Sequence, residues 1–285
     1  MDLENLELTD KVRNTLPGSF IQTSNGYVHY QLKGDGELVV LVHGMTTPLF
    51  VWDPLFETLS NNGFRVLRYD LFGRGYSDRF PGKNDVDLYN KQLYELLTTL
   101  RLVDQKITLV GLSLGGAICA NFAIRHSELI KRICLIDPVH PSKLPRAMKL
   151  LRVPGLNILL RKFVGHKMLF ASLSDNFYNY EDFPNFKDNF SEQLQFMGYS
   201  KAVISTMVHY DLKNLDRIYR AIGKLKVPIC LFWGEQDTVV PYEANEKLRT
   251  AIPDIIFHSI KEAGHLSHYE KPEIVNPLLL AFLDT

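Results

Sequence analysis

The chain has 285 residues, of which 46% are hydrophobic and 22% charged, so it can bury a core and lacks the composition of a disordered protein. Its 32 basic and 32 acidic residues balance, and no overall charge favours binding to nucleic acid. Residues 1–15 lack the apolar centre of a signal peptide, and no apolar run reaches the length of a transmembrane helix, so we expect a cytoplasmic protein.

The N-terminal part of the sequence predicts a β-hairpin followed by buried strands and helices. An Asn-Gly turn at Asn25 and Gly26 separates two short runs of strand-forming residues, which is typical of a hairpin. Leu38–Val42 is an unbroken run of aliphatic residues, as in a strand that is buried on both faces of a parallel sheet. The other elements expected here are a strand at Phe64–Tyr69 and helices at Trp52–Asn61 and Leu88–Leu100.

A serine enclosed by glycines follows the next predicted strand. Ile107 begins a β-branched run that leads into Gly111-x-Ser113-x-Gly115, and a helical pattern of small residues comes directly after it. A serine in a sharp turn between a strand and a helix needs glycine neighbours, because the turn leaves no room for their Cβ atoms. The pattern therefore predicts a nucleophile elbow with Ser113 at the turn.

Strands and helices continue to alternate after this turn, except over one long segment. The later elements expected are strands at Lys131–Ile136, Ile229–Trp233 and Ile255–Ile260 and helices at Tyr242–Thr250 and Pro272–Leu283. No buried-strand pattern occurs between Val139 and Ile222, where the sequence is helical, aromatic and irregular. We expect an α/β fold with a mostly parallel central sheet flanked by helices, in which residues 1–138 and 223–285 form the core and residues 139–222 are inserted as a helical lid.

Two residues that a nucleophilic serine requires occur later in the chain, each directly after a predicted strand. A serine hydroxyl becomes a nucleophile when a base takes its proton and a third group orients that base. In folds with a nucleophile elbow, the acid and then the histidine follow the serine along the chain. Asp237 follows one late strand and His265 the next, so Ser113, Asp237 and His265 are the expected catalytic triad.

Sequence motifs spread over most of the chain resemble those of the α/β-hydrolase-fold serine hydrolases, of the esterase and lipase type with a helical lid. They are His43-Gly44, Asp70-x-x-Gly73-x-Gly75-x-Ser77, Gly111-x-Ser113-x-Gly115-Gly116, Gly234-x-x-Asp237-x-x-x-Pro241, and Gly264-His265 with Glu270-x-Pro272. The resemblance covers residues 39–272 apart from the lid. It implies that Ser113 is the nucleophile, that His265 is the general base and then the general acid, and that Asp237 orients the imidazole.

The resemblance further implies an oxyanion hole and leaves two assignments with alternatives. The hole would be formed by the backbone N–H groups of Met45 and Leu114, while His43 would position the loop. Asp137 is the alternative acid, because some members of the family place the acid after the strand that follows the elbow. His268 is the alternative base, although it lacks the preceding glycine.

Metal and cofactor sites are not indicated by the sequence. The nine histidines include no His-x-x-x-His pair on a helical face, and the sequence contains no Cys-x-x-Cys. Cys119, Cys134 and Cys230 lie in apolar element patterns, which predicts buried free thiols rather than disulfides. We therefore expect neither a metal nor a cofactor.

The expected lid has a composition that bears on the substrate and on membranes. Residues 139–174 hold seven basic side chains and no acidic one, interleaved with large apolar residues. Residues 143–170 therefore fit either an amphipathic stretch that lies on anionic lipid or a helical cap whose basic side chains face water. Both interpretations place an apolar roof over Ser113, which favours substrates with hydrophobic acyl groups.

The expected function is hydrolysis of small-molecule carboxylic esters with hydrophobic acyl groups, such as monoacylglycerols, through an acyl-serine intermediate. One alternative is a carbon–carbon bond hydrolase with the same triad, which is disfavoured because the loop after His43-Gly44 is poorer in glycine than is usual there. The other is a non-catalytic receptor for a small ligand on the same fold, which the intact triad disfavours. The oligomeric state is left open.

Overall fold

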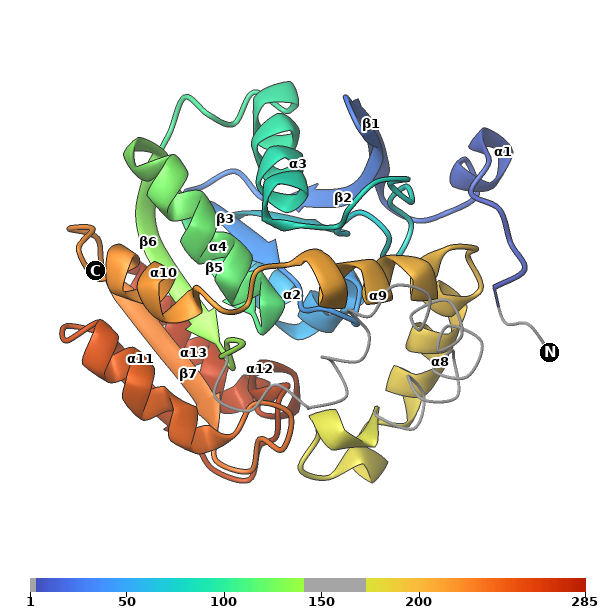
Figure 1. Ribbon diagram of the computed structural model, residues 1–285. Helices are drawn as coiled ribbons and strands as arrows, with labels where there is room; N and C mark the ends of the chain where they lie inside the picture. Colours follow the sequence, from blue (N-terminus) through green and yellow to red (C-terminus); the bar gives the residue numbers. More distant parts are fainter. Residues whose placement is uncertain (1–3, 141–172) are drawn as a thin grey trace.

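The computed structural model describes residues 4–140 and 173–285, which form one eight-stranded sheet with helices on both sides (Figure 1). The strand order is β1-β2-β4-β3-β5-β6-β7-β8. The pairs β1–β2 and β2–β4 are antiparallel and the other neighbouring pairs are parallel, so the mostly parallel sheet predicted from the sequence is confirmed. The strands are β1 (Ser19–Thr23), β2 (Gly26–Lys33), β3 (Leu38–Val42), β4 (Arg65–Tyr69), β5 (Ile107–Leu112), β6 (Ile130–Ile136), β7 (Ile229–Gly234) and β8 (Ile256–Ile260).

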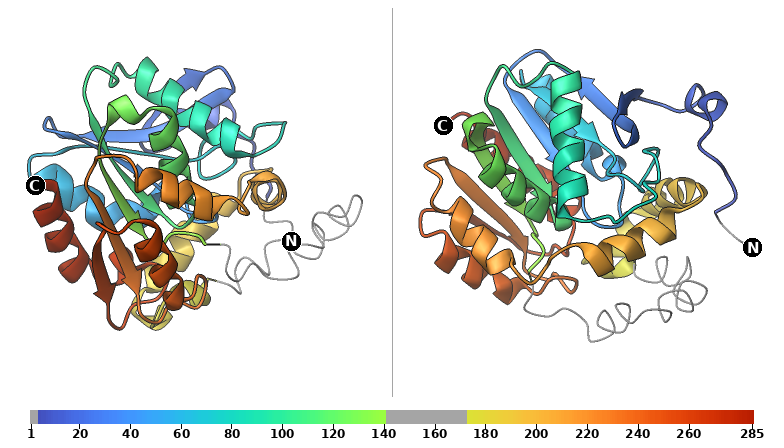
Figure 2. Two further views of the ribbon diagram at one scale, coloured as in Figure 1. Left: turned by 60° about the vertical axis from the view of Figure 1, so that its left-hand side comes forward. Right: turned by 45° about the horizontal axis from the view of Figure 1, so that its top comes forward.

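The two faces of the sheet carry separate layers of helices and separate apolar cores. Successive side chains of a strand point to opposite faces, and in β3 Val40 packs into one core while Leu41 packs into the other. Helices α3, α4, α10 and α11 cover the Val40 face, and α2, α12 and α13 cover the Leu41 face (Figures 1 and 2). Their bounds are α2 (Asp53–Asn61), α3 (Val86–Thr99), α4 (Leu114–Arg125), α10 (Leu215–Ile222), α11 (Asn245–Ala251), α12 (Ser267–Glu270) and α13 (Pro272–Leu283).

Local sequence signals fix where several of these helices begin. The Asp85 side chain accepts a hydrogen bond of 3.0 Å from the Leu88 N–H and so caps α3. α13 begins at Pro272, whose fixed φ suits the first turn of a helix. The helix predicted over Tyr242–Thr250 is shorter than expected, because residues 242–244 form a 3₁₀ turn before α11 starts at Asn245.

The described part of the chain between β6 and β7 consists of helices joined by turns and irregular segments, without a strand. α10 packs against α4 and α11, whereas α8 (Pro184–Leu194) and α9 (Tyr199–His209) lie beside the carboxyl ends of the strands (Figure 1). The N-terminal segment, with α1 at Asp10–Arg13, reaches this region through a β-bridge between Leu6 and Phe196. Residues 141–172 lie outside the described residues, and with them the basic stretch 143–170, so the lid over 139–222 stays a prediction.

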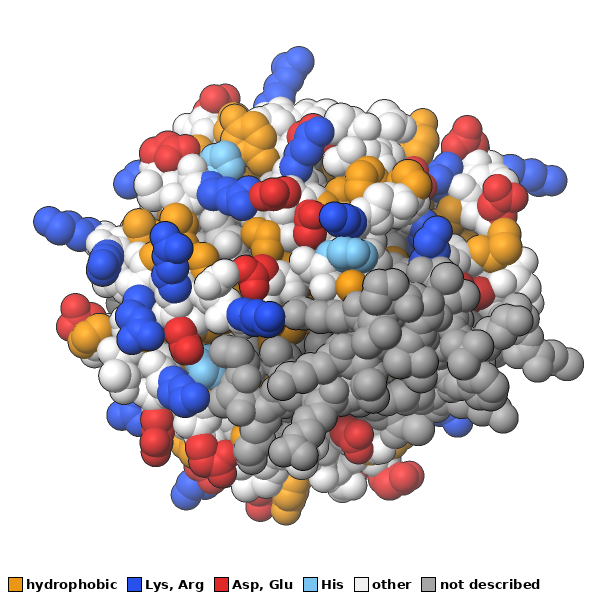
Figure 3. Space-filling view, viewed as in Figure 1, with side chains coloured by type: hydrophobic (Ala, Val, Ile, Leu, Met, Phe, Trp, Pro, Cys, Tyr) orange, Lys and Arg blue, Asp and Glu red, His pale blue; other side chains and the backbone are white. Residues whose placement is uncertain are grey.

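Three further expectations concern cysteines, membrane spans and surface charge. Cys119, Cys134 and Cys230 are buried free thiols, as predicted. Within residues 4–140 and 173–285, no helix has the length and apolar character needed to cross a membrane. On the face shown in Figure 3, basic and acidic side chains are interspersed, in keeping with the balanced composition.

Candidate active site

Ser113 stands at the turn between β5 and α4, where the backbone is strained. Its φ of 52° and ψ of −117° are unusual for a residue that carries a side chain. A Cβ at Gly111 would lie 2.5 Å from the Gly115 carbonyl oxygen, and a Cβ at Gly115 would lie 2.0 Å from that of Val42. The turn therefore requires both glycines, and it places Ser113 at the carboxyl end of the central strand.

His265 and Asp237, which follow β8 and β7, are hydrogen-bonded to each other. Nδ1 of His265 lies 2.8 Å from Oδ2 of Asp237, and both residues are buried. The other carboxylate oxygen of Asp237 accepts hydrogen bonds of 2.9 Å from the N–H groups of Val239 and Val240. The loop thus fixes the carboxylate against Nδ1 of the imidazole, which leaves Nε2 as the nitrogen that can exchange a proton with a serine.

Carboxylates surround the buried imidazole of His265. Burial disfavours its protonated form, but the attraction of Asp237, followed by that of Asp137 and Glu270, outweighs this effect. The pKa of His265 consequently lies above its usual value. This environment stabilises the imidazolium that forms when the histidine takes a proton.

Asp137, the alternative acid, belongs to the same buried cluster but has different partners. One of its carboxylate oxygens accepts a 2.8 Å hydrogen bond from the Gly234 N–H, and the other accepts bonds from the N–H and the hydroxyl of Ser267, at 3.2 and 2.6 Å. Burial and the nearby Asp237 carboxylate raise the pKa of Asp137. The geometry favours Asp237 as the acid, while Asp137 ties the ends of β6 and β7 to the loop that carries His265.

His268, the alternative base, has no carboxylate among its hydrogen-bond partners in the described residues. Its Nε2 lies 3.1 Å from the Val51 carbonyl oxygen, and its ring centroid is 4.5 Å from that of Trp52. Burial lowers the pKa of His268 to about 3. A histidine that is so weakly basic and packed against a tryptophan is poorly suited to general base catalysis, and the geometry favours His265.

Glu270 fixes the histidine loop, a role that sequence reasoning missed although the residue lies in a recognised motif. One oxygen of its carboxylate accepts a 2.6 Å hydrogen bond from the Gly264 N–H, and the other accepts a 2.7 Å bond from the Tyr178 N–H. Tyr178 belongs to the segment before α8, so the two bonds join the loop after β8 to a part of the chain that is distant in sequence. The spacing Glu270-x-Pro272 carries no signal for a partner of this kind.

The loop after β3 lies against Ser113 and is oriented by His43. A Cβ at Gly44 would be 3.4 Å from Cβ of Ser113. Burial lowers the pKa of His43 to about 4, so its ring is neutral at neutral pH. Nε2 of His43 accepts a 2.9 Å hydrogen bond from the Leu71 N–H, and its proton is therefore on Nδ1, which donates to the Gly44 carbonyl at 2.8 Å.

The two backbone N–H groups predicted to form an oxyanion hole belong to the loop after β3 and to the start of α4. The Met45 N–H belongs to the same peptide as the Gly44 carbonyl, so the bond from His43 also orients this N–H. Leu114 is the first residue of α4, and an N–H at this position has no acceptor within the helix. Gly44 lies against Ser113 and Leu114 directly follows it, so both N–H groups belong to backbone near the serine, and their role as oxyanion donors stays a prediction.

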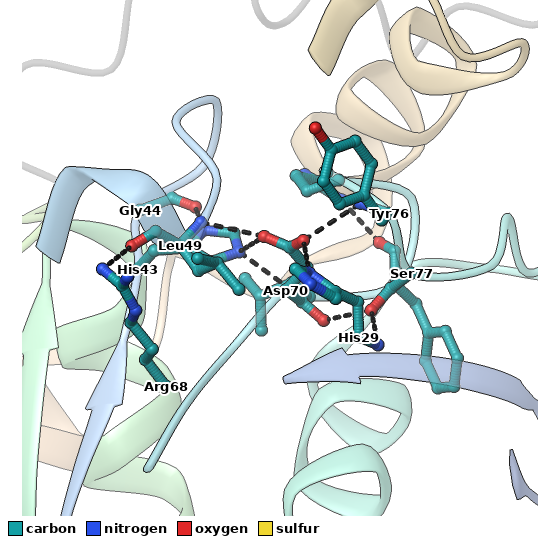
Figure 4. A network of polar contacts seen from close by, with 12 residues as sticks. His29, His43, Gly44, Leu49, Arg68, Asp70, Tyr76 and Ser77 are labelled. Carbon is teal, nitrogen blue, oxygen red and sulfur yellow. Dashed lines mark hydrogen bonds and ion pairs between the residues drawn. The ribbon is translucent and has the colours of Figure 1, made fainter. Parts of the chain in front are cut away.

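A buried polar network anchors the far end of the same loop (Figure 4). The Asp70 carboxylate accepts hydrogen bonds from the N–H groups of Leu49 and Tyr76, at 2.8 and 3.0 Å. His29 donates to this carboxylate at 2.7 Å through Nδ1, and its Nε2 lies 2.8 Å from the Pro17 carbonyl oxygen. Burial opposes ionisation of Asp70, but the hydrogen bond and charge of His29 outweigh it and lower the pKa of Asp70. An ionised Asp70 thus holds the backbone at Leu49.

Comparisons with known proteins agree with the fold described above. Residues 37–272 match the model of a protein family described as alpha/beta hydrolase fold. The chain is 26% identical to a 2-hydroxy-6-oxo-6-phenylhexa-2,4-dienoate hydrolase of Comamonas testosteroni, over 91% of this chain and 92% of that protein. Among solved structures, a thermophilic esterase from Thermogutta terrifontis superposes with a TM-score of 0.78 at 24% identity, covering 94% of this chain and 98% of that one. The enol-lactonase from Burkholderia xenovorans gives a TM-score of 0.76 at 22% identity, with 94% and 100% covered.

Proposed function

Because the chain belongs to the α/β-hydrolase fold family, we propose that it is a serine hydrolase that cleaves carboxylic esters through an acyl-serine intermediate. The observation that carries this proposal is the buried hydrogen bond of 2.8 Å between His265 and Asp237, set at the same edge of the sheet as the strained turn of Ser113. Strain of this kind at a residue with a side chain is typical of functional sites.

In the proposed acylation step, the hydroxyl oxygen of Ser113 attacks the ester carbonyl while Nε2 of His265 takes the hydroxyl proton. Asp237 keeps the imidazole in the tautomer that can accept this proton, and it stabilises the imidazolium that results. The carbonyl oxygen gains negative charge and accepts hydrogen bonds from the N–H groups of Met45 and Leu114, each worth roughly 2.7–4 kcal/mol of barrier. When the tetrahedral intermediate collapses, His265 returns the proton to the departing alcohol.

The proposed deacylation step repeats this chemistry with water as the nucleophile. Nε2 of His265 takes a proton from the water, whose oxygen attacks the acyl carbon, and the same two N–H groups stabilise the oxyanion. Collapse then releases the carboxylic acid, and Ser113 recovers its proton from His265. Since these residues supply the base, the acid and the oxyanion donors, the cycle needs no metal or organic cofactor. Within the described residues, no group of three or more His, Cys, Asp and Glu side chains is placed to hold a metal ion.

The proposed substrates carry hydrophobic acyl groups, for example monoacylglycerols or other single-chain esters. Support comes from the composition of residues 139–174, whose large apolar side chains would form part of a lid above Ser113. The seven basic residues of the same segment also support contact with anionic lipid, although a solvated cap has the same composition. Sedimentation with anionic and with neutral vesicles separates the two, because only a lipid-binding stretch sediments selectively with the anionic ones.

A carbon–carbon bond hydrolase is the second candidate. It is supported by two relatives named 2-hydroxy-6-oxo-6-phenylhexa-2,4-dienoate hydrolase, one from Comamonas testosteroni at 26% identity and one from Burkholderia cepacia at 25%. Such a reaction would use the same serine, acid and histidine. The two candidates therefore differ in substrate rather than in the residues of the site.

The test is a substrate profile of the purified protein, with Ser113→Ala as the control. We expect turnover of p-nitrophenyl esters that varies with acyl-chain length and falls to background in Ser113→Ala, whose fold is checked by circular dichroism. Faster cleavage of a 2-hydroxy-6-oxo-dienoate than of any ester would favour the second candidate. Stoichiometric binding of a small ligand with no turnover of either substrate would instead indicate a receptor and contradict the proposal.

A further inference from the structure

Three successive backbone carbonyls of the loop after β3 each accept a hydrogen bond from a side chain, the first from the adjacent residue and the other two from distant parts of the chain. The Gly44 carbonyl accepts the bond from His43, as described above. The Met45 carbonyl accepts a 2.8 Å hydrogen bond from Nε of Arg74, and the Thr46 carbonyl accepts a 2.5 Å bond from the hydroxyl of Tyr199. We call residues 44–47 the oxyanion loop. Each of its three peptides is held by a side-chain hydrogen bond, including the two that flank the Cα of Met45.

We propose that Arg74 and Tyr199 are positioning residues that hold the oxyanion loop in the geometry in which the Met45 N–H can bind the developing oxyanion. The inference rests on the proposed function, since it assigns a task to residues around the same site. The peptide planes on both sides of the Met45 Cα are fixed, one by His43 and one by Arg74. A loop lacking one of these bonds would sample other orientations of the N–H, and displacements of about 1 Å near a reacting group can cost about 10²-fold in rate.

Arg74 is unusual because its guanidinium is completely buried and bonded to neutral acceptors in the described part of the chain. Besides the Met45 carbonyl, these acceptors are the Phe72 carbonyl, the Tyr89 hydroxyl and the Thr206 hydroxyl, at 3.1, 2.6 and 2.7 Å. A buried charge without an ionised partner costs stability, so its presence points to another use. Here the positive charge lies one hydrogen bond away from the loop that is to stabilise a negative oxygen.

Both contacts lead to helix α9, which therefore sets the position of the oxyanion loop. Tyr199 is the first residue of α9, and Thr206, which accepts the bond from Arg74, lies two turns further along the same helix. The start of α9 is anchored in turn by the Glu4 carboxylate, which accepts hydrogen bonds of 2.6 and 2.7 Å from the N–H groups of Gly198 and Ser200. Helix α9, which is distant from Ser113 in sequence, is thus joined to the oxyanion loop by hydrogen bonds of Tyr199 and Arg74.

The experiment compares Arg74→Lys and Tyr199→Phe with two matched controls. Lysine keeps the charge but lacks the planar fork that reaches several acceptors at once, and phenylalanine removes only the hydroxyl. Arg132→Lys is the first control, because this buried arginine binds Glu37 at the amino ends of the strands, away from the site. Tyr210→Phe is the second control. Tyr210 lies directly after the C-terminal end of α9, and the substitution removes a buried hydroxyl that accepts a hydrogen bond from Asn121.

Three readouts are taken on each variant: ester hydrolysis, inhibition by an alkyl boronic acid that forms a tetrahedral adduct with serine, and hydrogen exchange of the peptide spanning residues 44–49. For Arg74→Lys and Tyr199→Phe we expect kcat to fall about tenfold or more while KM changes by less than about threefold. Binding of the boronic acid should weaken in parallel with kcat/KM, and the loop peptide should exchange faster. Both controls should stay within about twofold of the wild type in all three readouts.

The outcomes separate this inference from the proposed function. If the wild type hydrolyses no ester, the proposed function fails, and the exchange of residues 44–49 still decides whether Arg74 and Tyr199 hold the loop. If the wild type is active and both variants keep kcat and the exchange rate of the loop unchanged, the positioning role is wrong. An equal loss of activity in the controls would contradict it as well, because the effect would then be one of general stability.

Discussion

Around His265, three carboxylates have different tasks that follow from their hydrogen bonds. Asp237 bonds to the imidazole itself, Asp137 bonds to Gly234 and Ser267, and Glu270 bonds to the backbone before the histidine. All three favour a proton on His265, but only the first can select the tautomer. Substitution by the isosteric amide should therefore have a different effect at each position.

Asp237→Asn should lower kcat by about 10⁴-fold, because an amide in this place favours the wrong tautomer of the imidazole. Asp137→Asn should keep kcat within about tenfold of the wild type. It should lower the free energy of unfolding by about 1–3 kcal/mol, because the amide N–H₂ would replace a carboxylate oxygen that now accepts a hydrogen bond from a buried backbone N–H. Ester hydrolysis and urea denaturation of both variants measure these effects. The opposite pattern in kcat would assign the acid to Asp137.

The activity should rise with pH through a pKa above the ordinary histidine value of 6.5, because His265 acts as a base only when neutral and its carboxylate neighbours raise its pKa. Glu270→Gln removes one of these negative charges, so the acidic limb of kcat/KM should move to lower pH. Glu262→Gln is the matched control, because the Glu262 side chain is largely exposed and pairs with Lys271 at 3.7 Å. A limb that stays in place in Glu270→Gln, or that moves equally in the control, would contradict this account of the pKa.

At the scale of elements, the elbow between β5 and α4 depends on close contact between backbones. A Cβ added at Gly111 or Gly115 would meet main-chain atoms, which cannot give way as a flexible side chain can. The elbow also bonds directly to the next strand, through the Ser113 N–H and the Ile136 carbonyl at 3.0 Å. Disturbing the turn should therefore disturb both the sheet and Ser113.

Gly115→Ala should lower the free energy of unfolding by about 3 kcal/mol and reduce activity, because its Cβ would meet the Val42 and His43 carbonyl oxygens at 2.0 and 2.7 Å. Gly63→Ala is the control: its φ of 84° is unfavourable for alanine, but no atom lies within 4 Å of the added Cβ. We expect this control to cost about 1 kcal/mol and to keep full activity. Equal losses of stability and activity in the two variants, measured by chemical denaturation and ester hydrolysis, would show that crowding at the elbow is not the cause.

The residues of the site differ in how far the sequence alone predicts them. Ser113, Asp237 and His265 are predictable because each follows a strand whose composition marks it, and the order of the three along the chain is fixed by the fold. Arg74 and Tyr199 are not predictable, since they act through hydrogen bonds to backbone carbonyls, and any residue type can provide a carbonyl. Glu270 lies between these cases, because its motif is recognisable while its partner at Tyr178 depends on tertiary contacts.

At the scale of the whole molecule, the sheet collects the site and the surrounding segments hold it. Parallel strands bring Ser113, Asp237 and His265 to one edge, as expected for α/β folds. The loops at this edge are then fixed from outside the sheet by residues 174–178 and by α9, whose start is anchored by Glu4 of the N-terminal segment. These outer segments belong to the parts of the chain whose sequence carries the weakest pattern, whereas His43, Arg74 and Glu270, which bond to the same loops, lie within recognised motifs.

Mass spectrometry of the intact protein tests most directly whether Ser113 forms a covalent acyl intermediate. The wild type, mixed with an activated ester and quenched within the first turnover, should gain the mass of one acyl group. Peptide mapping should place that group on Ser113, and a fluorophosphonate probe should label the same residue. Ser113→Ala should show neither adduct. A wild type that turns over the ester without any adduct on Ser113, or that is neither acylated nor labelled, would contradict the account.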